Sequence, residues 1–259
     1  MEYIKAQVKD NIGTIVLDND EKRNSMSIGM LEEILQAFND FAAQKVRVVI
    51  IKSNPGAKVW SAGLDVSELP DPGKDPLPYN HPLEQVMRKI EDFSAPVIAM
   101  IEGSVWGGGC DMAFSCDILI GTENCAFAIT PAKIGVPYNV AGLIHFLNLV
   151  EMNIAKEMFF TAKPITSDRA YNLGIINHLK HVDEIEEFTM KMAKEITFNS
   201  PLAISAIKEQ LNLLGRARPM NPIVFERISD LRRKAFNSQD FLEGKNAFLE
   251  KRKPVFKGI

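Results

Sequence analysis

Short apolar runs rich in β-branched residues alternate with segments of helical periodicity through the first half of the chain. We expect strands at 3–8, 14–17, 46–51, 96–101, 118–120 and 126–129, and helices at 28–43, 83–92 and 108–115. Ser27 stands directly before the first helical segment, where its hydroxyl can cap the helix. Strands that alternate with helices need crossover connections, which predict an α/β core.

The second half of the chain changes character after about residue 140, where helical patterns dominate. One strand-like run lies at 175–179, and charged helical segments follow at 184–198, 201–214 and 222–236. We therefore expect an α/β core over residues 1–190 and a helical C-terminal region over 191–259. A segment crowded with Pro, Gly and Asp at 70–82 predicts a loop, and one use of such a loop is a lid over a site.

Composition excludes several classes of protein. With 46% hydrophobic and 24% charged residues in a chain of 259, we expect a soluble globular protein. A net charge of −3 argues against a general nucleic-acid binder, and no apolar run approaches the ~20 residues that span a membrane. Three cysteines without close pairing argue against disulfides and against zinc, so we expect a cytoplasmic protein with no metal site.

Two glycine-containing turns are the first candidates for a functional site. Gly107, Gly108 and Gly109 lie between a strand and a helix start, where backbone N–H groups are unpaired. The pattern matches neither nucleotide-binding glycine motif, and a tight packing turn explains the glycines equally well. A similar segment, 60–65 (WSAGLD), follows an earlier strand. Two such turns can converge at the ends of neighbouring strands and form an oxyanion hole from two N–H groups.

At this level of detail the chain resembles the crotonase (enoyl-CoA hydratase/isomerase) superfamily. The resemblance rests on A-G-x-D at 62–65, E-G-x-x-x-G-G-G-x-D at 102–111 and F-L-E-K-R-K-P at 248–254, and it covers the whole chain. It implies a ββα spiral core, a helical C-terminal trimerisation region and acyl-CoA thioester substrates. It also implies self-association as a trimer or a dimer of trimers.

Further strings resemble the methylmalonyl-CoA decarboxylase branch of the superfamily: Glu102–Gly108, Thr130-Pro131, Gly135–Asn139 and Asp75-Pro76-Leu77. This resemblance implies conversion of methylmalonyl-CoA, or a close malonyl-type thioester, to propionyl-CoA and CO2. It places the backbone N–H groups of Leu64 and Gly108 in the oxyanion hole, although these decarboxylases carry His where Leu64 stands. Tyr138 matches the tyrosine that engages the leaving carboxylate.

Two carboxylates would be required for the hydratase reaction, which needs a general base and a general acid. Asp111 stands at the first family position, and Ala132 occupies the second. Asp111 can serve as a base or an orienting group, or as a negative charge at a helix N-terminus. An enoyl-CoA hydratase or isomerase with Asp111 as its only carboxylate is the alternative function, and a non-catalytic CoA-binding protein is a third.

The CoA portion of the substrate is expected to meet basic residues. The resemblance implies CoA contacts from Lys22, Arg23, Ala62, Phe248 and Lys251, the last two usually contributed by a neighbouring subunit. A basic excess near the C-terminus of an acidic chain suits a small polyanion. No cofactor is expected beyond the CoA of the substrate, the four histidines show no metal-ligand spacing, and Cys110 is expected to be a packed residue.

Overall fold

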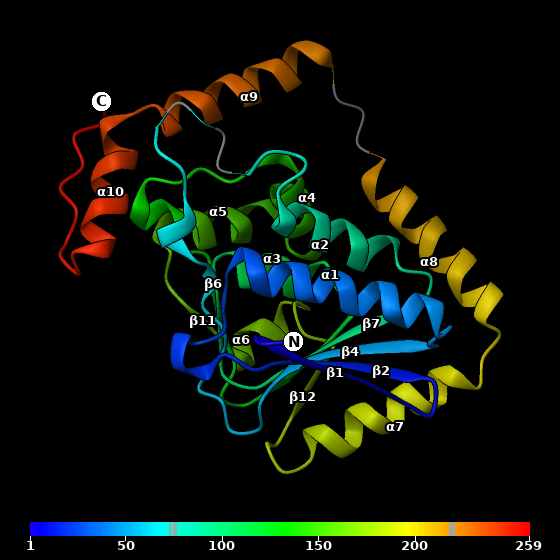
Figure 1. Ribbon diagram of the computed structural model, residues 1–259. Helices are drawn as coiled ribbons and strands as arrows, with labels where there is room; N and C mark the ends of the chain where they lie inside the picture. Colours follow the sequence, from blue (N-terminus) through cyan, green and yellow to red (C-terminus); the bar gives the residue numbers. More distant parts are fainter. Residues whose placement is uncertain (73, 75–76, 218–220) are drawn as a thin grey trace.

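Two mainly parallel sheets form the centre of the computed structural model, which describes residues 1–72, 74, 77–217 and 221–259 (Figure 1). The six-stranded sheet has the order β1-β2-β4-β7-β9-β12 and the four-stranded sheet the order β11-β10-β8-β5. Only the β1–β2 and β10–β11 pairs in these two sheets are antiparallel within the described residues. The strands are β1 (Ile4–Lys9), β2 (Ile12–Leu17), β3 (Ser25–Met26), β4 (Val48–Ser53), β5 (Val59–Ser61), β6 (Gly63–Leu64), β7 (Val97–Ile101), β8 (Ser104–Trp106), β9 (Ile118–Thr122), β10 (Ala126–Ala128), β11 (Ile165–Thr166) and β12 (His178–Lys180).

The chain alternates between the two sheets as it advances. Strand β4 of the large sheet is followed by β5 of the small one and then by a helix, and the pairs β7–β8 and β9–β10 repeat this order. Three successive turns of strand, strand and helix make the ββα spiral that the sequence resemblance implies. The helices are α1 (Ile28–Ala43), α2 (Pro82–Asp92), α3 (Gly108–Phe114), α4 (Val140–Leu149), α5 (Met152–Thr161), α6 (Ser167–Asn172), α7 (Ile185–Thr197), α8 (Pro201–Arg216), α9 (Pro222–Phe236) and α10 (Gln239–Leu249).

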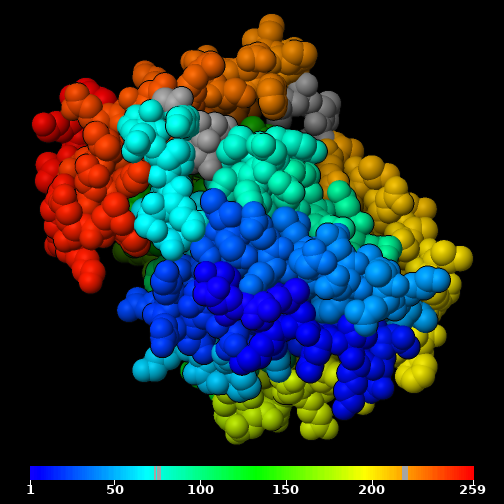
Figure 2. Space-filling model, viewed as in Figure 1, coloured from blue at the N-terminus to red at the C-terminus, as the bar shows by residue number. Residues whose placement is uncertain are grey.

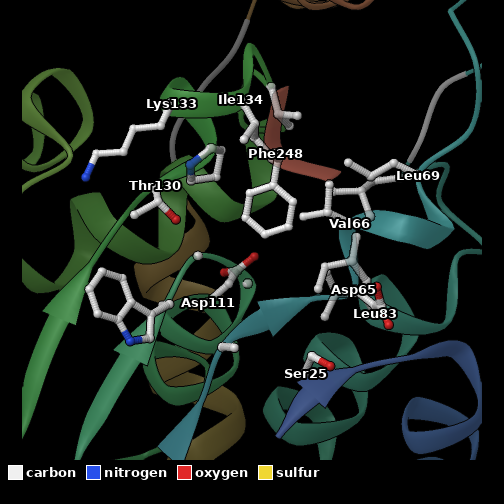
Figure 3. A pocket seen from close by; sticks show the side chains of 18 of the residues that line it. Ser25, Asp65, Val66, Leu69, Leu83, Asp111, Thr130, Lys133, Ile134 and Phe248 are labelled. Carbon is white, nitrogen blue, oxygen red and sulfur yellow. The ribbon is translucent and has the colours of Figure 1, made fainter. Parts of the chain in front are cut away.

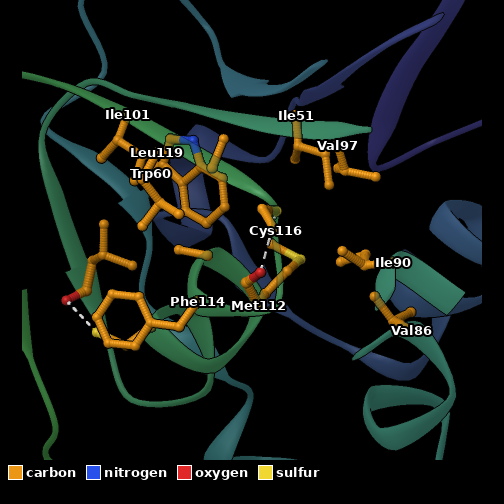
Figure 4. Packing of buried hydrophobic residues seen from close by; sticks show 14 of the residues in the cluster. Ile51, Trp60, Val86, Ile90, Val97, Ile101, Met112, Phe114, Cys116 and Leu119 are labelled. Carbon is orange, nitrogen blue, oxygen red and sulfur yellow. Dashed lines mark hydrogen bonds between the residues drawn. The ribbon is translucent and has the colours of Figure 1, made fainter. Parts of the chain in front are cut away.

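Strand β4, in the interior of the large sheet, is buried on both faces. Val49 and Ile51 of β4 pack toward the main core, whereas Val48 and Ile50 pack toward α7 with Ala193. This two-sided burial explains why the strand reads as one continuous apolar run. Figure 4 shows the main core between the sheet and α2 and α3, where residues such as Trp60, Val86 and Met112 meet.

Helix α1 begins and ends at the residues that the sequence predicts. The Ser27 hydroxyl accepts a hydrogen bond from the Met30 N–H at 3.3 Å and caps the helix. Met30, Leu31 and Ile34 are buried on its core-facing side. The apolar residues recur at helical spacing because they cover the sheet.

Three very short strands lie in segments that the sequence analysis treats as turns. Strand β8 occupies part of the glycine-rich stretch 103–109, and β5 and β6 flank Ala62. The strand-like run at 175–179 becomes a strand only from His178 to Lys180. Strands of two or three residues carry too little pattern to be recognised, because pairing with distant neighbours stabilises them.

Helices α8, α9 and α10 follow the core and lie around its periphery, with α8 at the right, α9 at the top and α10 at the left of the view (Figures 1 and 2). The expected division between residues 190 and 191 falls inside α7, whose buried Ile185 and Ala193 pack on the large sheet. Residues 73, 75 and 76, within the loop expected at 70–82, lie outside the described residues. No helix in the described part of the chain is long and apolar enough to cross a bilayer.

Candidate active site

A cavity of about 920 Å³ opens between the spiral core and α10 (Figure 3). Its walls are largely apolar and include Leu69, Leu83 and Ile134. Every residue that the sequence analysis assigns to catalysis or CoA binding lines this one cavity: Lys22, Arg23, Ala62, Leu64, Gly108, Asp111, Tyr138, Phe248 and Lys251. Residues spread over 230 positions of the chain therefore meet at one place.

Two backbone turns meet at the base of the cavity. They follow β5 and β8, which are parallel neighbours with Ser61 opposite Val105. Gly63 has φ +85°, and a methyl group there would lie 2.5 Å from the Trp106 carbonyl oxygen and 3.0 Å from the Gly108 nitrogen. Only glycine permits both this conformation and this approach, so the Leu64 and Gly108 nitrogens lie on adjoining turns.

The loop that carries Lys22 and Arg23 is attached to the first of these turns. The Ala62 N–H donates to the Arg23 carbonyl at 2.9 Å, and the Ser61 hydroxyl donates to the Asn24 carbonyl at 2.9 Å. Arg23 and Asn24 both have positive φ, which turns the loop back toward the cavity. The two basic side chains therefore stand at the mouth of the cavity rather than along the sheet edge.

Tyr138 lies over the first turn of α4. A methyl group at Gly142 would lie 2.7 Å from the tyrosine ring, so glycine leaves the space that the ring occupies. The ring packs edge-on against Phe146 and Phe159, and its hydroxyl donates to the Gly107 carbonyl at 3.0 Å. Burial and the nearby charge of Asp111 raise the pKa of Tyr138 well above its usual value, so the hydroxyl keeps its proton.

Asp111 is the acidic residue of α3 that reaches the cavity. Its Oδ1 lies 2.5 Å from Nδ1 of His145, and Nε2 of His145 lies 3.2 Å from Oε1 of Glu91. Burial by itself would lower the pKa of His145, but its hydrogen bonds to Asp111 and Glu91 outweigh burial and raise the pKa to about 10. The carboxylate of Asp111 is thus held in a buried ion pair.

Among the described residues that line the cavity, Asp65 is the other acidic side chain. Its Oδ1 accepts hydrogen bonds from the Ser67 N–H and hydroxyl at 3.0 and 2.7 Å, which places it at the start of a short helical turn. Ala132 stands in the turn 131–134, where a hydratase of this superfamily would carry its second carboxylate. The described lining therefore offers Asp111 as the acid–base candidate, because Asp65 is engaged by Ser67 and position 132 carries no carboxylate.

Basic and aromatic side chains surround the mouth of the cavity. Lys133 joins Lys22, Arg23 and Lys251 there, and Phe248 projects across the opening (Figure 3). Helix α10 supplies Phe248 from the same chain, whereas the sequence resemblance assigns such contacts to a neighbouring subunit. This placement follows from the docking of α10 on its own core: the Lys245 ammonium donates to the Leu69 carbonyl at 2.6 Å, and Gly244 packs on the Ile134 backbone.

Several residues with polar side chains near the site were not identified from the sequence, and Thr130 and His145 are the two closest to the proposed chemistry. Thr130 carries a hydroxyl into the cavity next to Gly107, and His145 lies behind Asp111. One local signal pointed to His145: it lies three residues after Gly142 and so shares a buried face of α4 with it, and the Tyr138 ring packs against Gly142. Without the fold, nothing identified the acidic partners of that histidine on α2 and α3.

Cys110, next to Asp111, is fully buried, and burial raises the pKa of its thiol far above the usual value. The Cys110 thiol donates to the Val105 carbonyl at 3.3 Å and acts as a packed residue, as the sequence predicts. No group of three or more potential metal ligands occurs among the described residues.

Comparison with known proteins places this geometry in a family. The family model described as enoyl-CoA hydratase/isomerase matches residues 7–259. The chain is 43% identical to methylmalonyl-CoA decarboxylase of Escherichia coli (strain K12) over 257 residues, which cover 99% of this chain and 98% of the relative. It is 27% identical to a short-chain-enoyl-CoA hydratase of Clostridium acetobutylicum, with 98% of this chain and 97% of the relative covered.

Solved structures agree with the sequence comparison. A methylmalonyl-CoA decarboxylase complexed with 2S-carboxypropyl-CoA superposes with a TM-score of 0.97 at 43% identity, covering 100% of this chain and 99% of the other. A carnitinyl-CoA hydratase of Mycobacterium avium has the same fold with a TM-score of 0.81 at 25% identity and complete coverage of both chains. With a family match over nearly its whole length and a cavity built on two glycine turns, the chain belongs to the enoyl-CoA hydratase/isomerase family.

Proposed function

We propose that the protein is a carboxy-lyase that converts methylmalonyl-CoA, or a close malonyl-type thioester, to propionyl-CoA and CO2. The observation that carries this proposal is the state of the two carboxylates in the described lining: Asp111 is held in a buried ion pair with His145, and Asp65 accepts hydrogen bonds from Ser67. Addition of water to a double bond needs a base and an acid, whereas loss of CO2 needs neither to break the carbon–carbon bond. The 43% identity to a methylmalonyl-CoA decarboxylase supports the same reaction.

The reaction leaves an enolate whose negative charge is concentrated on the thioester oxygen. We assign its stabilisation to the N–H groups of Leu64 and Gly108, which lie on adjoining turns at the base of the cavity. One donor of this kind contributes roughly 3–4 kcal/mol to the transition state. A leucine at position 64 supplies this donor as well as any other residue, because the backbone provides it.

The departing carboxylate must stand out of the thioester plane so that its electrons enter the π system. Tyr138 and Thr130 place hydroxyls in the wall of the cavity on either side of Gly107. Tyr138 donates to the Gly107 carbonyl, so engaging a carboxylate requires its hydroxyl to turn from that carbonyl. A proton then reaches the α-carbon from water or from Tyr138.

The CoA portion extends to the mouth of the cavity. The cations of Lys22, Arg23 and Lys251 suit its pyrophosphate and 3′-phosphate, and Phe248 presents a flat ring for the adenine. Ala62 lines the cavity and contributes to the CoA site through its backbone. The substrate thus carries its own CoA, and the proposed chemistry calls for no separate cofactor. We further propose a cytoplasmic location, which suits three buried free thiols: Cys110, Cys116 and Cys125.

Product analysis by mass spectrometry tests the function. Methylmalonyl-, ethylmalonyl-, malonyl- and crotonyl-CoA are each incubated with the protein and followed over time. We expect loss of CO2 from methylmalonyl-CoA and no change in crotonyl-CoA. Hydration of crotonyl-CoA that disappears in Asp111→Ala would establish the hydratase alternative, and binding of all four thioesters without turnover would contradict an enzyme.

We propose that helices α8–α10 mediate assembly into a trimer or a dimer of trimers. Large apolar side chains are exposed on α8 and α9, more than a monomer of this size commonly leaves in one region. They are Leu202, Ile207, Leu211, Leu213, Leu214, Ile223, Val224, Phe225 and Leu231. Sedimentation velocity across a range of protein concentrations tests this assembly, and a concentration-independent monomer would contradict it.

A further inference from the structure

A histidine with a carboxylate at each ring nitrogen lies directly behind the cavity. His145 on α4 is 8% exposed, with Asp111 of α3 at 2.5 Å from Nδ1 and Glu91 of α2 at 3.2 Å from Nε2. A neutral imidazole has one donor and one acceptor nitrogen, whereas ionised carboxylates only accept hydrogen bonds. Because both carboxylates accept, both ring nitrogens of His145 must donate, and the geometry therefore points to the protonated imidazolium form.

The histidine belongs to a line of alternating charges that runs from the cavity to the surface. Arg216 of α8 lies 2.7 Å from the second oxygen of Glu91 and 3.4 Å from the exposed Asp92 carboxylate. The formal charges of Asp111, His145, Glu91 and Arg216 sum to zero, and Asp92 lies at the solvent end of this line. Glu84 of α2 faces the same group. Burial and the charge of Asp111 raise the pKa of Glu84, and its carboxyl accepts a hydrogen bond from the Asn139 amide.

This neutrality matters because Asp111 also borders the space that the acyl group would occupy. Figure 3 shows its carboxylate directed into the cavity, below Phe248. A malonyl-type thioester brings a second carboxylate into the same apolar space. Like charges in a poorly solvated site disfavour each other, and a cation within hydrogen-bonding distance of one of them offsets this repulsion.

We propose that His145 is a positioning residue that neutralises Asp111 and thereby lets the cavity accept a ligand with a carboxylate on its acyl chain. The inference rests on the proposed function in that the substrate carries this carboxylate. His145 is not among the described residues that line the cavity, so it acts through the Asp111 side chain that it holds.

Binding measurements with two ligands separate this role from a merely structural one. Carboxypropyl-CoA carries the acyl carboxylate and propionyl-CoA lacks it, while both share the CoA portion. In His145→Gln we expect the Kd of carboxypropyl-CoA to rise about tenfold, equivalent to one pKa unit of charge interaction. The Kd of propionyl-CoA should change less than about twofold. Equal weakening of both ligands would overturn the proposal.

A double variant provides a rescue test, and a distant histidine provides the control. His145→Gln combined with Asp111→Asn removes both charges, so the affinity for carboxypropyl-CoA should return toward that of the unmodified protein. His181 also contacts two carboxylates, Glu123 and Asp183 at 3.3 Å each, but it is exposed and distant in sequence from the site. His181→Gln should bind both ligands normally. A double variant as weak as His145→Gln would contradict charge compensation.

Nitrogen NMR of the unmodified protein tests directly whether His145 is protonated on both ring nitrogens. Both ring nitrogens of His145 should remain protonated from pH 6 to pH 9, and a neutral tautomer in that range would overturn the proposal. The binding and NMR readouts do not use turnover. Failure of the proposed function would appear instead as an absence of CO2 release by the unmodified protein.

Discussion

Single glycines decide how closely the backbone turns of the cavity approach one another. Gly63 combines φ +85° with a position where a methyl group would meet the Trp106 carbonyl oxygen at 2.5 Å. A residue with a side chain would be strained in this backbone conformation, and its Cβ atom would also push the two turns apart. The distance between the two proposed oxyanion donors therefore depends on the lack of a side chain at Gly63.

Gly63→Ala should lower kcat/KM at least about 100-fold, the effect of losing one oxyanion donor. Steady-state kinetics on methylmalonyl-CoA measure this change. Gly56→Ala is the matched control, because Gly56 also has positive φ (+76°) but no atom lies within 4 Å of the added methyl group. Equal losses in both variants would show that backbone strain, rather than the separation of the two turns, causes the effect.

Tyr138→Phe should lower kcat about 100-fold while changing KM little, because the ring still packs on Phe146 and Phe159 and only the hydroxyl is lost. Rapid-quench measurement of CO2 release follows the chemical step directly. Tyr171→Phe, at a half-exposed position on α6, serves as the control. Unchanged turnover in Tyr138→Phe would remove the tyrosine from the mechanism.

At the scale of elements, the site depends on how α10 docks on the spiral. Phe236, Phe241 and Leu69 form a small core under this helix, and Gly244 touches the Ile134 backbone. Only a glycine lets the helix axis approach so closely. The docking brings Phe248 and Lys251 of the same chain to the mouth of the cavity.

Gly244→Ala should displace α10 and raise the KM for acyl-CoA about tenfold, since weakened contacts with the CoA portion reduce binding more than chemistry. Gly215→Ala provides a helical control, because the methyl group there meets only the Asn148 amide at 3.6 Å. Kinetics with a fixed acyl group and varied concentration resolve KM from kcat. A fall in kcat at constant KM would contradict a role in CoA binding.

For the whole molecule, the buried His145 makes stability depend on pH. Its pKa rises from 6.5 to about 10 on folding, so the native state binds the proton more tightly than the unfolded state. The stabilisation is complete below pH 6.5 and is lost as pH rises toward 10, because unfolding then releases a proton.

We therefore expect the free energy of unfolding to fall by up to about 1.4 kcal/mol per pH unit between pH 6.5 and 10, relative to His145→Gln. Urea denaturation at a constant protein concentration measures both proteins at pH 6, 7.5 and 9. Parallel pH profiles for the two proteins would contradict this prediction, because they would show that folding does not change the pKa of His145.

Many of the secondary-structure elements and cavity-lining residues could be predicted from local sequence patterns. The β-branched run of β4 identified its strand because both faces of that strand are buried, and the periodicity of α1 identified its helix because α1 is long and buries one side. The glycine turns and Asp111, read with the family resemblance, identified the residues that line the cavity. Such signals are local, since they depend on backbone conformation and side-chain spacing within a few residues.

Other features depended on residues that are far apart in the chain. Sequence alone did not pair His145 with Asp111 and Glu91, because three separate helices supply the three side chains. It also did not show that α10 brings Phe248 to the cavity of its own chain. The sequence by itself determined which chemical groups are present and which elements carry them. Only the tertiary structure decided which charges compensate one another, because electrostatic interactions depend on distance and burial rather than on order along the chain.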